Sequence, residues 1–269
     1  MRIVVVPAVY NRPDMLIALF EGYLAQDYRN FEIIVADDGS RAETKEVIER
    51  YQRRANFRIA HVWQENTGYR ASTIRNKAVA QSEADYVIFT DQDCVPRPDF
   101  VSRHALLAEH GWFVPGNRVL LAQHFTQQIL AEGKFIHDFY LAQWVVRRVQ
   151  GDINRFLPLL KLPAGSWRKL QPKRWYGAKT CNLAVWRDDL VRVNGMDESY
   201  TGWGMEDSDL VIRLLRAGVR HKSGRFALPV LHLWHKENDR SQLEENQRRL
   251  QQLLSATHIR AHQGLDQYL

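Results

Sequence analysis

Three carboxylates cluster in the segment YTGWGMEDSDL, residues 200–210, where Glu206, Asp207 and Asp209 follow Trp203. The segment opens a stretch with the apolar spacing of an amphipathic helix, and the free N–H groups of a helix start favour ionised carboxylates. Acids that only complement the helix dipole need neither a tryptophan nor flanking glycines. A carboxylate at such a place can also remove a proton from an attacking hydroxyl group. The segment therefore indicates either a stabilised helix start or a general base.

Two further acids flank a glutamine in the segment DQD, formed by Asp91, Gln92 and Asp93 at the end of an apolar run. Hard cations such as Mg²⁺ and Mn²⁺ prefer carboxylate oxygens and complete their shell with phosphate oxygens. A DxD triplet is also common in surface turns that bind nothing. No glycine-rich phosphate loop follows the first apolar run, so we favour a divalent cation that bridges a diphosphate.

Apolar runs alternate with helical patterns along the first hundred residues. The runs at 3–9, 31–40, 57–63 and 85–93 have the composition of buried strands, and helical spacing separates them, as at 72–80. This alternation predicts an α/β fold with a doubly wound, mostly parallel sheet and right-handed crossovers. Ligands of such sheets bind beyond the carboxyl ends of the strands.

Polar and charged residues follow each of the four expected strands. They are Tyr10, Asn11 and Arg12 after the first, Asp37, Asp38, Gly39 and Ser40 after the second, Asn66 to Arg70 after the third, and Asp91, Gln92 and Asp93 after the fourth. Each group also has the composition of an ordinary turn or helix cap. Because the fold brings all four strand ends to one crevice, we expect the groups to form one site.

Composition narrows the classes of protein. The chain has 269 residues, 45% of them hydrophobic, which suits one large α/β domain with appendages. The first apolar run, Ile3 to Val9, is too short for a signal peptide or a membrane span, so a cytoplasmic location is expected. Cys94 and Cys181 form no CxxC pair, so we expect neither a disulfide framework nor a thiolate metal site. The net charge of +6 suits a polyanion, a nucleotide phosphate or an anionic membrane.

Five segments occur in a distinctive order along the chain: PAVYNR, DDGS, NTGYRASTIRN, DQD and GWGMEDSDL. The ordered set resembles the inverting nucleotide-sugar glycosyltransferases of family 2, which have the GT-A fold. The resemblance covers roughly residues 1–115 and 176–235. Its WGxED segment is similar to that of the chondroitin-polymerising and galactosyl-transferring members.

The resemblance implies a role for each matching residue. It assigns nucleotide binding to Pro7, Ala8, Tyr10, Arg12, Asp38, Arg70, Asp91 and Gln92, acceptor binding to Trp203, Gly204 and Glu206, and the role of general base to Asp207. In the family, the residue matching Tyr10 stacks on the base and the residue matching Asp38 binds it. Ala8 stands where most members have Thr or Ser, so a hydroxyl is missing and only a backbone contact remains.

The resemblance also implies Mn²⁺ or Mg²⁺ as cofactor, bound by Asp93 and by a histidine after the last core strand. The segment LPVLHLWHKEN contains His232 and His235, and a strand would send side chains at this spacing to opposite faces. Only one of them is therefore expected to reach the metal. His232 directly follows the apolar run and is our first choice, and His235 is the alternative.

We divide the chain into four segments. They are a nucleotide-sugar-binding half at 1–115, a basic, aromatic and helical insertion at 116–175, an acceptor-binding and catalytic half at 176–238, and a C-terminal helix at 239–269. The last segment shows a capping box formed by Ser241 and Glu244 and a narrow apolar stripe at Leu243, Leu250, Leu254 and Thr257. This helix is expected to pack on the body or to pair with another subunit, which leaves the oligomeric state open.

The insertion carries eight Lys or Arg residues against one acid between Arg147 and Arg174. This composition fits a surface for an anionic glycan acceptor, such as the cluster Arg168, Lys169, Lys173 and Arg174. It also fits a patch that rests on a membrane carrying a lipid-linked acceptor. The third interpretation is a solvated helical insertion packed by Trp144 and Val145.

Together these patterns predict a metal-dependent inverting glycosyltransferase of the hexosyltransferase type. It would move a sugar from a nucleoside diphosphate donor, with UDP as first choice, to a saccharide or lipid-linked saccharide hydroxyl. The expected setting is bacterial surface polysaccharide or lipopolysaccharide assembly, at the inner face of the membrane and with no nucleic-acid partner. A nucleotidyltransferase is one alternative, although it usually needs a basic, glycine-rich loop. A catalytically silent sugar-nucleotide or glycan-binding module is the other, and the intact Asp93 and Asp207 argue against it.

Overall fold

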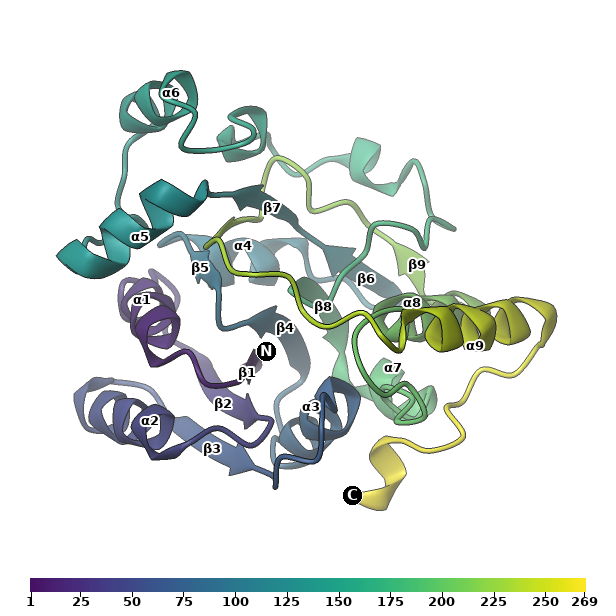
Figure 1. Ribbon diagram of the computed structural model, residues 1–269. Coiled ribbons are helices and arrows are strands. Elements are labelled where there is room, and N and C mark those ends of the chain that lie inside the picture. Colours follow the sequence, from purple (N-terminus) through teal and green to yellow (C-terminus); the bar gives the residue numbers. More distant parts are fainter.

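The centre of the molecule is a seven-stranded sheet, seen edge-on among the helices in Figure 1 of the computed structural model, which describes residues 1–269. In spatial order its strands are β3 (Ile59–Trp63), β2 (Phe31–Asp37), β1 (Ile3–Val9), β4 (Tyr86–Asp91), β8 (Asn182–Trp186), β6 (Trp112–Pro115) and β9 (Arg220–His221). The first four strands run parallel, and β8 lies antiparallel between β4 and β6. The predicted mostly parallel sheet is confirmed.

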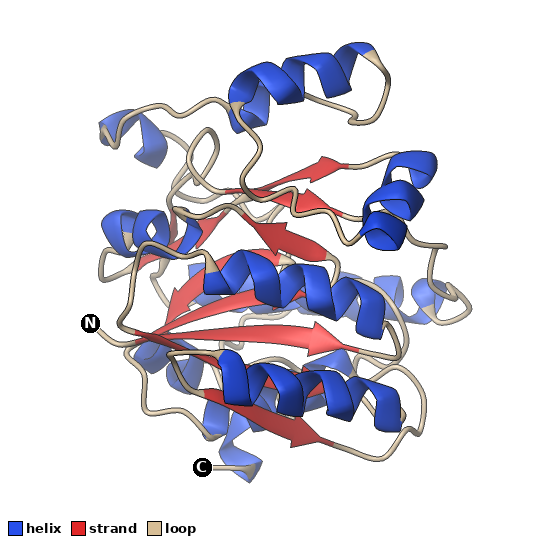
Figure 2. Ribbon diagram, turned by 90° about the vertical axis from the view of Figure 1, so that its left-hand side faces the viewer, coloured by secondary structure: helices blue, strands red, loops and turns tan.

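Helices cover both faces of this sheet (Figure 2). Successive side chains of β1 alternate, so that Ile3 and Val5 enter one core and Val4 and Val6 enter the other. The first core is completed by α1 (Pro13–Leu24), α2 (Ala42–Arg54) and α4 (Phe100–Leu107), and the second by α3 (Ala71–Ala80), α7 (Arg187–Arg192) and α8 (Glu206–Arg216). Burial on both faces explains the continuous apolar run of β1.

A second, three-stranded sheet extends the fold beyond the end of β4. Its strands are β5 (Cys94–Pro96), β10 (Pro229–His232) and β7 (Asn117–Leu120), with β10 in the middle. β10 runs antiparallel to β5 and pairs His232 with Cys94. This small sheet therefore carries the histidine region to the residues that follow the DQD segment.

The segment 116–175 contributes more than helices. It holds α5 (Gln123–Glu132), α6 (Leu141–Val149) and two short 3-10 turns, but it begins with strand β7, whose pairing with β10 ties it to the body. Trp144 is fully buried, whereas Val145 is 46% exposed, so only the tryptophan packs this helix as expected. No helix combines the length and the apolar character that crossing a membrane requires.

Much of the positive charge in this segment holds the fold together. Arg168 is 1% exposed, and its guanidinium donates to the carbonyl oxygens of Leu162, Pro163, Ser223 and Arg225. Lys169 pairs with Glu109 at 2.5 Å. The expectation of an open cluster that includes Arg168 is therefore wrong, because a buried guanidinium that donates to four carbonyl groups is unavailable to a ligand.

Helix α9 (Leu243–Ser255) is the predicted C-terminal helix, and it packs on the body against α8. Leu250 and Leu253 are buried beside Ile212, whereas Leu254 is 41% exposed. The expected capping box is wrong: the hydroxyl of Ser241 donates to Asp239 and caps nothing, and Gln242 occupies the N-cap position. The apolar stripe is consequently used within the chain.

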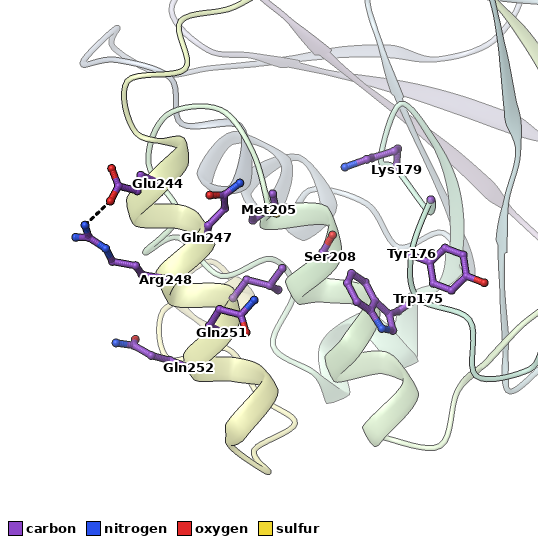
Figure 3. A pocket seen from close by; sticks show the side chains of 12 residues that line it. Trp175, Tyr176, Lys179, Met205, Ser208, Glu244, Gln247, Arg248, Gln251 and Gln252 are labelled. Atoms are coloured by element: carbon purple, nitrogen blue, oxygen red, sulfur yellow. Dashed lines mark hydrogen bonds and ion pairs between the residues drawn. The ribbon is translucent and has the colours of Figure 1, made fainter.

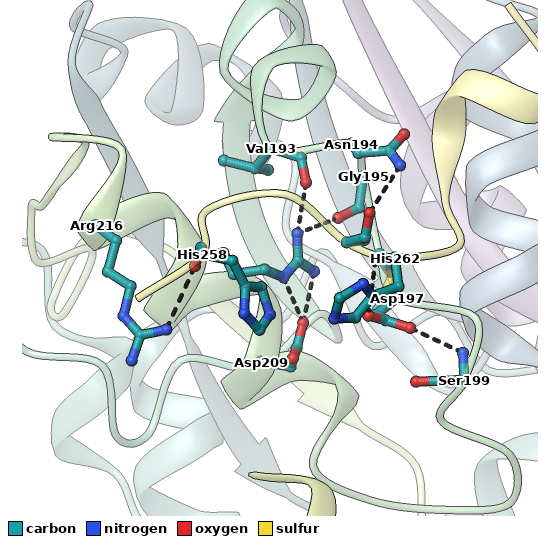
Figure 4. A network of polar contacts seen from close by, with 12 residues as sticks. Val193, Asn194, Gly195, Asp197, Ser199, Asp209, Arg216, His258 and His262 are labelled. Carbon is teal, nitrogen blue, oxygen red and sulfur yellow. Dashed lines mark hydrogen bonds and ion pairs between the residues drawn. The ribbon is translucent and has the colours of Figure 1, made fainter. Parts of the chain in front are cut away.

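A buried polar network fixes helix α8 against the loop that precedes it (Figure 4). Arg213 is fully buried, pairs with Asp209 at 2.6 Å, and donates to the carbonyl oxygens of Val193 and Gly195. Asp197 accepts from the backbone N–H groups of Ser199 and His262. Asp209, the third acid of the opening segment, is thus a structural partner of Arg213.

Candidate active site

The loops after β1 and β4 are locked together at the carboxyl edge of the sheet. The side-chain amide of Gln92 accepts from the backbone N–H of Tyr10 at 3.0 Å and donates to its carbonyl oxygen at 2.9 Å. The Tyr10 side chain is 46% exposed, and its hydroxyl accepts from Asn66 at 2.9 Å. The ring therefore stands open to the crevice, held at its tip, while Gln92 sets the position of the loop.

Asp38 connects the loop after β2 to the loop after β3. Its carboxylate accepts from the amide of Gln64 at 2.6 Å and from the backbone N–H of Arg70 at 2.7 Å. Burial raises the pKa of Asp38 in spite of these hydrogen bonds. Each oxygen keeps a lone pair, so the carboxylate can still accept from a ligand.

The remaining residues expected to bind the nucleotide lie along the same edge of the sheet. They differ in burial and in the hydrogen bonds that their side chains already make. Pro7 is buried within β1, and Ala8 is half-buried and in register with Asp91 of β4. Arg12 is engaged with Asp14 through two hydrogen bonds. Arg70 donates from its side chain to the carbonyl oxygen of Glu65 at 2.6 Å.

The two acids of the DQD segment have opposite environments. Asp91 accepts from the buried Arg75 at 2.5 Å, yet burial and the nearby Asp93 raise the pKa of Asp91 to about 6. Burial alone would also raise the pKa of Asp93, but His232 and His235 lower it to about 2. Asp93 therefore keeps its negative charge to a lower pH than Asp91 does.

Both histidines reach Asp93. The Nε2 atoms of His232 and His235 lie 3.4 Å and 2.9 Å from Oδ2 of Asp93, and the two ring centroids are 5.3 Å apart. Strand alternation does not separate the two rings, because β10 ends at His232 and no longer governs His235, so the expectation that only one of them binds the metal stays a prediction. The chain turns after the strand and brings the second ring back.

These donor atoms fit a divalent cation. Adjacent ligands of one Mg²⁺ ion at about 2.1 Å stand about 3 Å apart, which fits Oδ2 of Asp93 paired with either histidine, and Asp93, Cys94 and His232 place ligand atoms within 4.8 Å of one another. Imidazole and carboxylate together also suit Mn²⁺. Cys94 donates its thiol to Oδ1 of Asp93 at 3.1 Å, and burial raises the pKa of that thiol.

The two acids at the start of α8, Glu206 and Asp207, differ in their hydrogen-bond partners. Oδ1 of Asp207 accepts from the backbone N–H of Thr180 at 3.1 Å and from its hydroxyl at 2.5 Å, and Oδ2 lies 3.9 Å from the ammonium group of Lys179. Glu206 is 6% exposed and its Oε2 has no partner. Burial and the adjacent Asp207 raise the pKa of Glu206 to about 7. Asp207 thus has one oxygen fixed and one free.

A glycine turn delivers these acids. Gly202, Gly204 and Met205 all have positive φ angles, of 70°, 110° and 75°. The N–H of Gly202 donates to the carbonyl oxygen of Tyr69, which joins this turn to the loop after β3. Trp203 lies half-buried with the guanidinium of Arg240 5.0 Å from its ring centre. The loop after β3 and the turn before α8 are therefore in direct contact.

Arg75 is a site residue that the motif reading missed. It is 2% exposed, bonds Asp91, and feels the charges of Asp207 and Glu206, while its Nε and Nη1 atoms have no partner. A buried guanidinium with unused donors between two groups of acids is suited to an anion. Its place in NTGYRASTIRN was the available signal, because an arginine on the buried side of a helix needs a partner.

A small hollow of about 240 Å³ adjoins the acids and carries only positive charge. Arg118, Arg155 and Lys179 line this basic hollow, with no carboxylate among its lining residues. Asp91 and Asp93 act on the pKa of Arg118, which places it near both. This grouping could not be predicted from the sequence, because β7, the following insertion and the loop before β8 come together only in three dimensions.

Residues 3–150 match the family Glycosyl transferase family 2, and residues 166–236 match the family described as the N-terminal domain of galactosyltransferase. The chain therefore belongs to glycosyl transferase family 2. Among curated relatives, validoxylamine A glucosyltransferase of Streptomyces hygroscopicus subsp. limoneus is 32% identical over 226 residues, 80% of this chain and 48% of the relative. Chondroitin synthase of Escherichia coli is 25% identical over 241 residues, 84% of this chain and 34% of the relative. The chain spans between about a third and a half of these relatives.

Solved structures of low sequence identity share the fold. TarS of Staphylococcus aureus, residues 1–349 in complex with UDP, has a TM-score of 0.64 at 14% identity over 100% of this chain and 68% of that chain. A mannosyltransferase from Pyrobaculum calidifontis in complex with GDP-Man and Mn²⁺ has a TM-score of 0.60 at 16% identity over 88% of this chain and 58% of that chain. The expected GT-A fold is thereby confirmed.

Proposed function

We propose that the chain transfers a sugar from a nucleoside diphosphate donor to a saccharide hydroxyl with inversion at the anomeric carbon. One observation carries the proposal. The acids after β4 and the acids at the start of α8 meet around one buried arginine, Arg75, with the basic hollow alongside. A transfer needs both a place for the diphosphate and a base on the opposite side of the reacting carbon, and this arrangement provides both.

Asp207 acts as the base in this proposal. Thr180 holds Oδ1, so Oδ2 is the oxygen that takes the hydroxyl proton as the acceptor oxygen bonds to the anomeric carbon and the bond to the diphosphate breaks. Glu206 keeps its own proton up to a pH of about 7 and binds the acceptor beside Asp207, together with the Trp203 and Gly204 turn. Arg75, Arg118 and Lys179 receive the negative charge of the departing diphosphate.

Asp93 would hold Mn²⁺ or Mg²⁺, with His232 and His235 as the neighbouring donors. A bound divalent ion supplies further neutralisation of the diphosphate. Tyr10 and Asp38 would hold the nucleotide base, and UDP is our choice because the TarS structure contains it. The relatives' names support a saccharide acceptor, and surface polysaccharide assembly is proposed by family analogy alone.

A thermal-shift screen of nucleotide sugars tests the proposal. A ligand that binds only the folded chain raises the midpoint of unfolding by mass action, so UDP-sugars with Mn²⁺ are expected to raise Tm more than UDP-sugars with a chelator. Donor hydrolysis measured on the same samples separates an enzyme from a silent binding module. Stabilisation by nucleoside triphosphates but by no nucleotide sugar would instead point to nucleotidyl transfer.

Replacing Asp38 by Ala is expected to weaken uridine binding about 10- to 100-fold, with or without metal, because a hydrogen bond to a charged, buried group is lost. The change also loosens the loop after β3, which Asp38 holds through Gln64. Gln64→Ala is the comparison variant, since it removes one of the two loop contacts of Asp38, leaves the backbone N–H of Arg70, and keeps the carboxylate. Calorimetric titration of uridine distinguishes them. Equal losses in both variants would show that Asp38 only holds the loop.

A further inference from the structure

A groove of about 830 Å³ runs between α9 and the loop that precedes β8, beside the start of α8 (Figure 3). This volume lies in the upper part of the range of small-molecule sites. On one side are Gln247 and Gln251 of α9, on the other is Trp175, and Met205 and Leu250 lie between them. We call it the α9 groove. Of these five residues, only Met205 has a role in the site described above, as part of the turn before α8.

The α9 groove lies near the candidate base, although Asp207 itself is not one of its lining residues. Lys179 lines both the groove and the basic hollow, and its ammonium group lies 3.9 Å from Oδ2 of Asp207. Met205 and Ser208, which also line the groove, flank Glu206 and Asp207 in sequence. A molecule whose hydroxyl reached Asp207 would therefore extend into the groove.

The wall formed by α9 is anchored at three levels, once to the loop before α8 and twice to α8 itself. Asn246 donates to the carbonyl oxygen of Thr201 at 3.0 Å, Leu250 packs against Ile212, and Arg216 of α8 donates to the carbonyl oxygen of Leu253 at 2.8 Å. A helix held at its start, middle and end moves with the catalytic helix. The groove is consequently a permanent part of the fold, because the helix that forms its wall is fixed to the body of the protein.

The glycines of the opening segment serve this anchoring. A Cβ atom at Gly202 would stand 2.6 Å from Cβ of Gln242, and one at Gly204 would stand 2.9 Å from Cδ1 of Leu243. Both glycines also have positive φ angles, so a side chain would be strained as well as crowded. The turn that delivers the acids is therefore shaped to accept the start of α9.

The lining of the groove matches an uncharged saccharide. Trp175 offers a flat apolar surface for the C–H face of a sugar ring, and Met205 and Leu250 add apolar floor. The amides of Gln247 and Gln251, which Figure 3 shows turned toward the groove, each offer donors and an acceptor for hydroxyl groups.

The charges around the groove are largely balanced. Glu244 and Arg248 pair with each other at 2.6 Å on the outer side of α9, and Lys179 is the remaining charged lining residue. A polyanionic glycan needs a series of positive groups, and this wall does not present one. Amide and aromatic groups instead favour a ligand that is rich in hydroxyl groups and has no net charge.

We propose that the α9 groove binds the part of a saccharide acceptor that extends away from the reacting hydroxyl, and that this saccharide is uncharged. The inference rests on the proposed function, because Asp207 supplies the anchor for the reacting end. The inference adds the chemical class of the acceptor, which the residues from Trp203 to Asp207 do not define. It also assigns α9 a binding role that lies outside the residues matched by either family.

A glycan array with neutral and uronic-acid oligosaccharides tests this inference on the full chain with UDP and Mn²⁺ present. We expect retention on neutral oligosaccharides, followed by calorimetric titration of the best-retained neutral trisaccharide. Gln247→Ala combined with Gln251→Ala should weaken that titration about tenfold or more, the loss of two to three hydrogen bonds. Glu245→Gln combined with Arg249→Gln is the matched control, since this pair lies on α9 outside the groove lining and should bind as the wild type does.

Three outcomes would overturn the inference: retention on uronic-acid glycans alone, retention on no neutral glycan, or equal affinity of the groove variant and the wild type. Thermal unfolding of each variant shows whether α9 stays folded. Donor hydrolysis by the wild type is measured separately. A wild type that binds the neutral trisaccharide but does not hydrolyse any UDP-sugar would contradict the proposed function and leave the groove assignment standing.

Discussion

Asp207→Asn is expected to lower the rate of sugar transfer by about 10²- to 10⁴-fold, the usual contribution of a general base. Donor binding should survive, because Asp207 contacts neither the DQD segment nor the loops after β1 and β2. The measurement pairs transfer kinetics with titration of UDP and Mn²⁺. An asparagine variant that binds donor normally and transfers at a near wild-type rate would remove Asp207 from the mechanism.

The substitution isolates the proton-accepting function because the local structure tolerates it. The Asn oxygen can accept both hydrogen bonds that Thr180 now donates to Oδ1. The Asn amino group then replaces Oδ2, the oxygen that takes the proton in our proposal. Thr180→Val is the companion variant: it keeps the shape, removes the hydroxyl donor and is expected to cost less than Asp207→Asn, because the backbone N–H still orients the carboxylate.

Glu206→Gln is the matched control for the neighbouring acid, and the two carboxyl groups differ in pH behaviour. Folding raises the pKa of Glu206 from 4.5 to about 7, so ionisation of Glu206 opposes folding as pH rises through that window. Removing the acid should therefore stabilise the variant relative to the wild type more at pH 8 than at pH 5, as thermal unfolding would show. Loss of transfer in Glu206→Gln alone would move the base by one residue.

Strands β1 to β4 of the large sheet could be predicted because they follow a local rule, whereas β6, β8 and β9 were not predicted. A strand buried on both faces must be apolar throughout, as β1 is, and a helix that covers it must repeat its apolar residues every three to four positions. Strand β7 of the small sheet could not be predicted in this way, because it has only four residues, Asn117–Leu120, and mixes polar and charged with apolar side chains. Its strand character comes from pairing with β10, a partner more than a hundred residues away.

The site could be predicted where one segment supplies several groups, as in DQD and in the segment from Trp203 to Asp207. It could not be predicted where distant segments supply one group each. The basic hollow combines Arg118, Arg155 and Lys179, and burial alone decides that Arg168 is structural while Arg155 faces the hollow. The exposure and the pairing of a long cationic side chain depend on the tertiary structure. They cannot be predicted by counting charges in the sequence.

Asp93→Asn is expected to abolish most of the metal-dependent part of UDP binding. The asparagine keeps the volume of the side chain and an oxygen for the Cys94 thiol, but it removes the negative charge that His232 and His235 now stabilise. Residues that merely orient metal ligands contribute about 10- to 100-fold to metal affinity, so loss of a ligand should reach at least the upper end of that range. Transfer should fall with it.

Calorimetry of UDP in the presence of Mn²⁺ and in the presence of a chelator gives the test, and uridine serves as the internal control. Uridine affinity should stay unchanged in Asp93→Asn, because our proposal assigns the nucleotide base to Tyr10 and Asp38 and not to Asp93. The variants His232→Gln and His235→Gln then show which histidine binds the metal. The histidine whose loss removes the Mn²⁺ response is the ligand, and the other orients Asp93 from 3.4 Å or 2.9 Å. Unchanged affinity for UDP with Mn²⁺ in Asp93→Asn would show that this carboxylate holds no metal, and that its two histidines serve only to keep it charged.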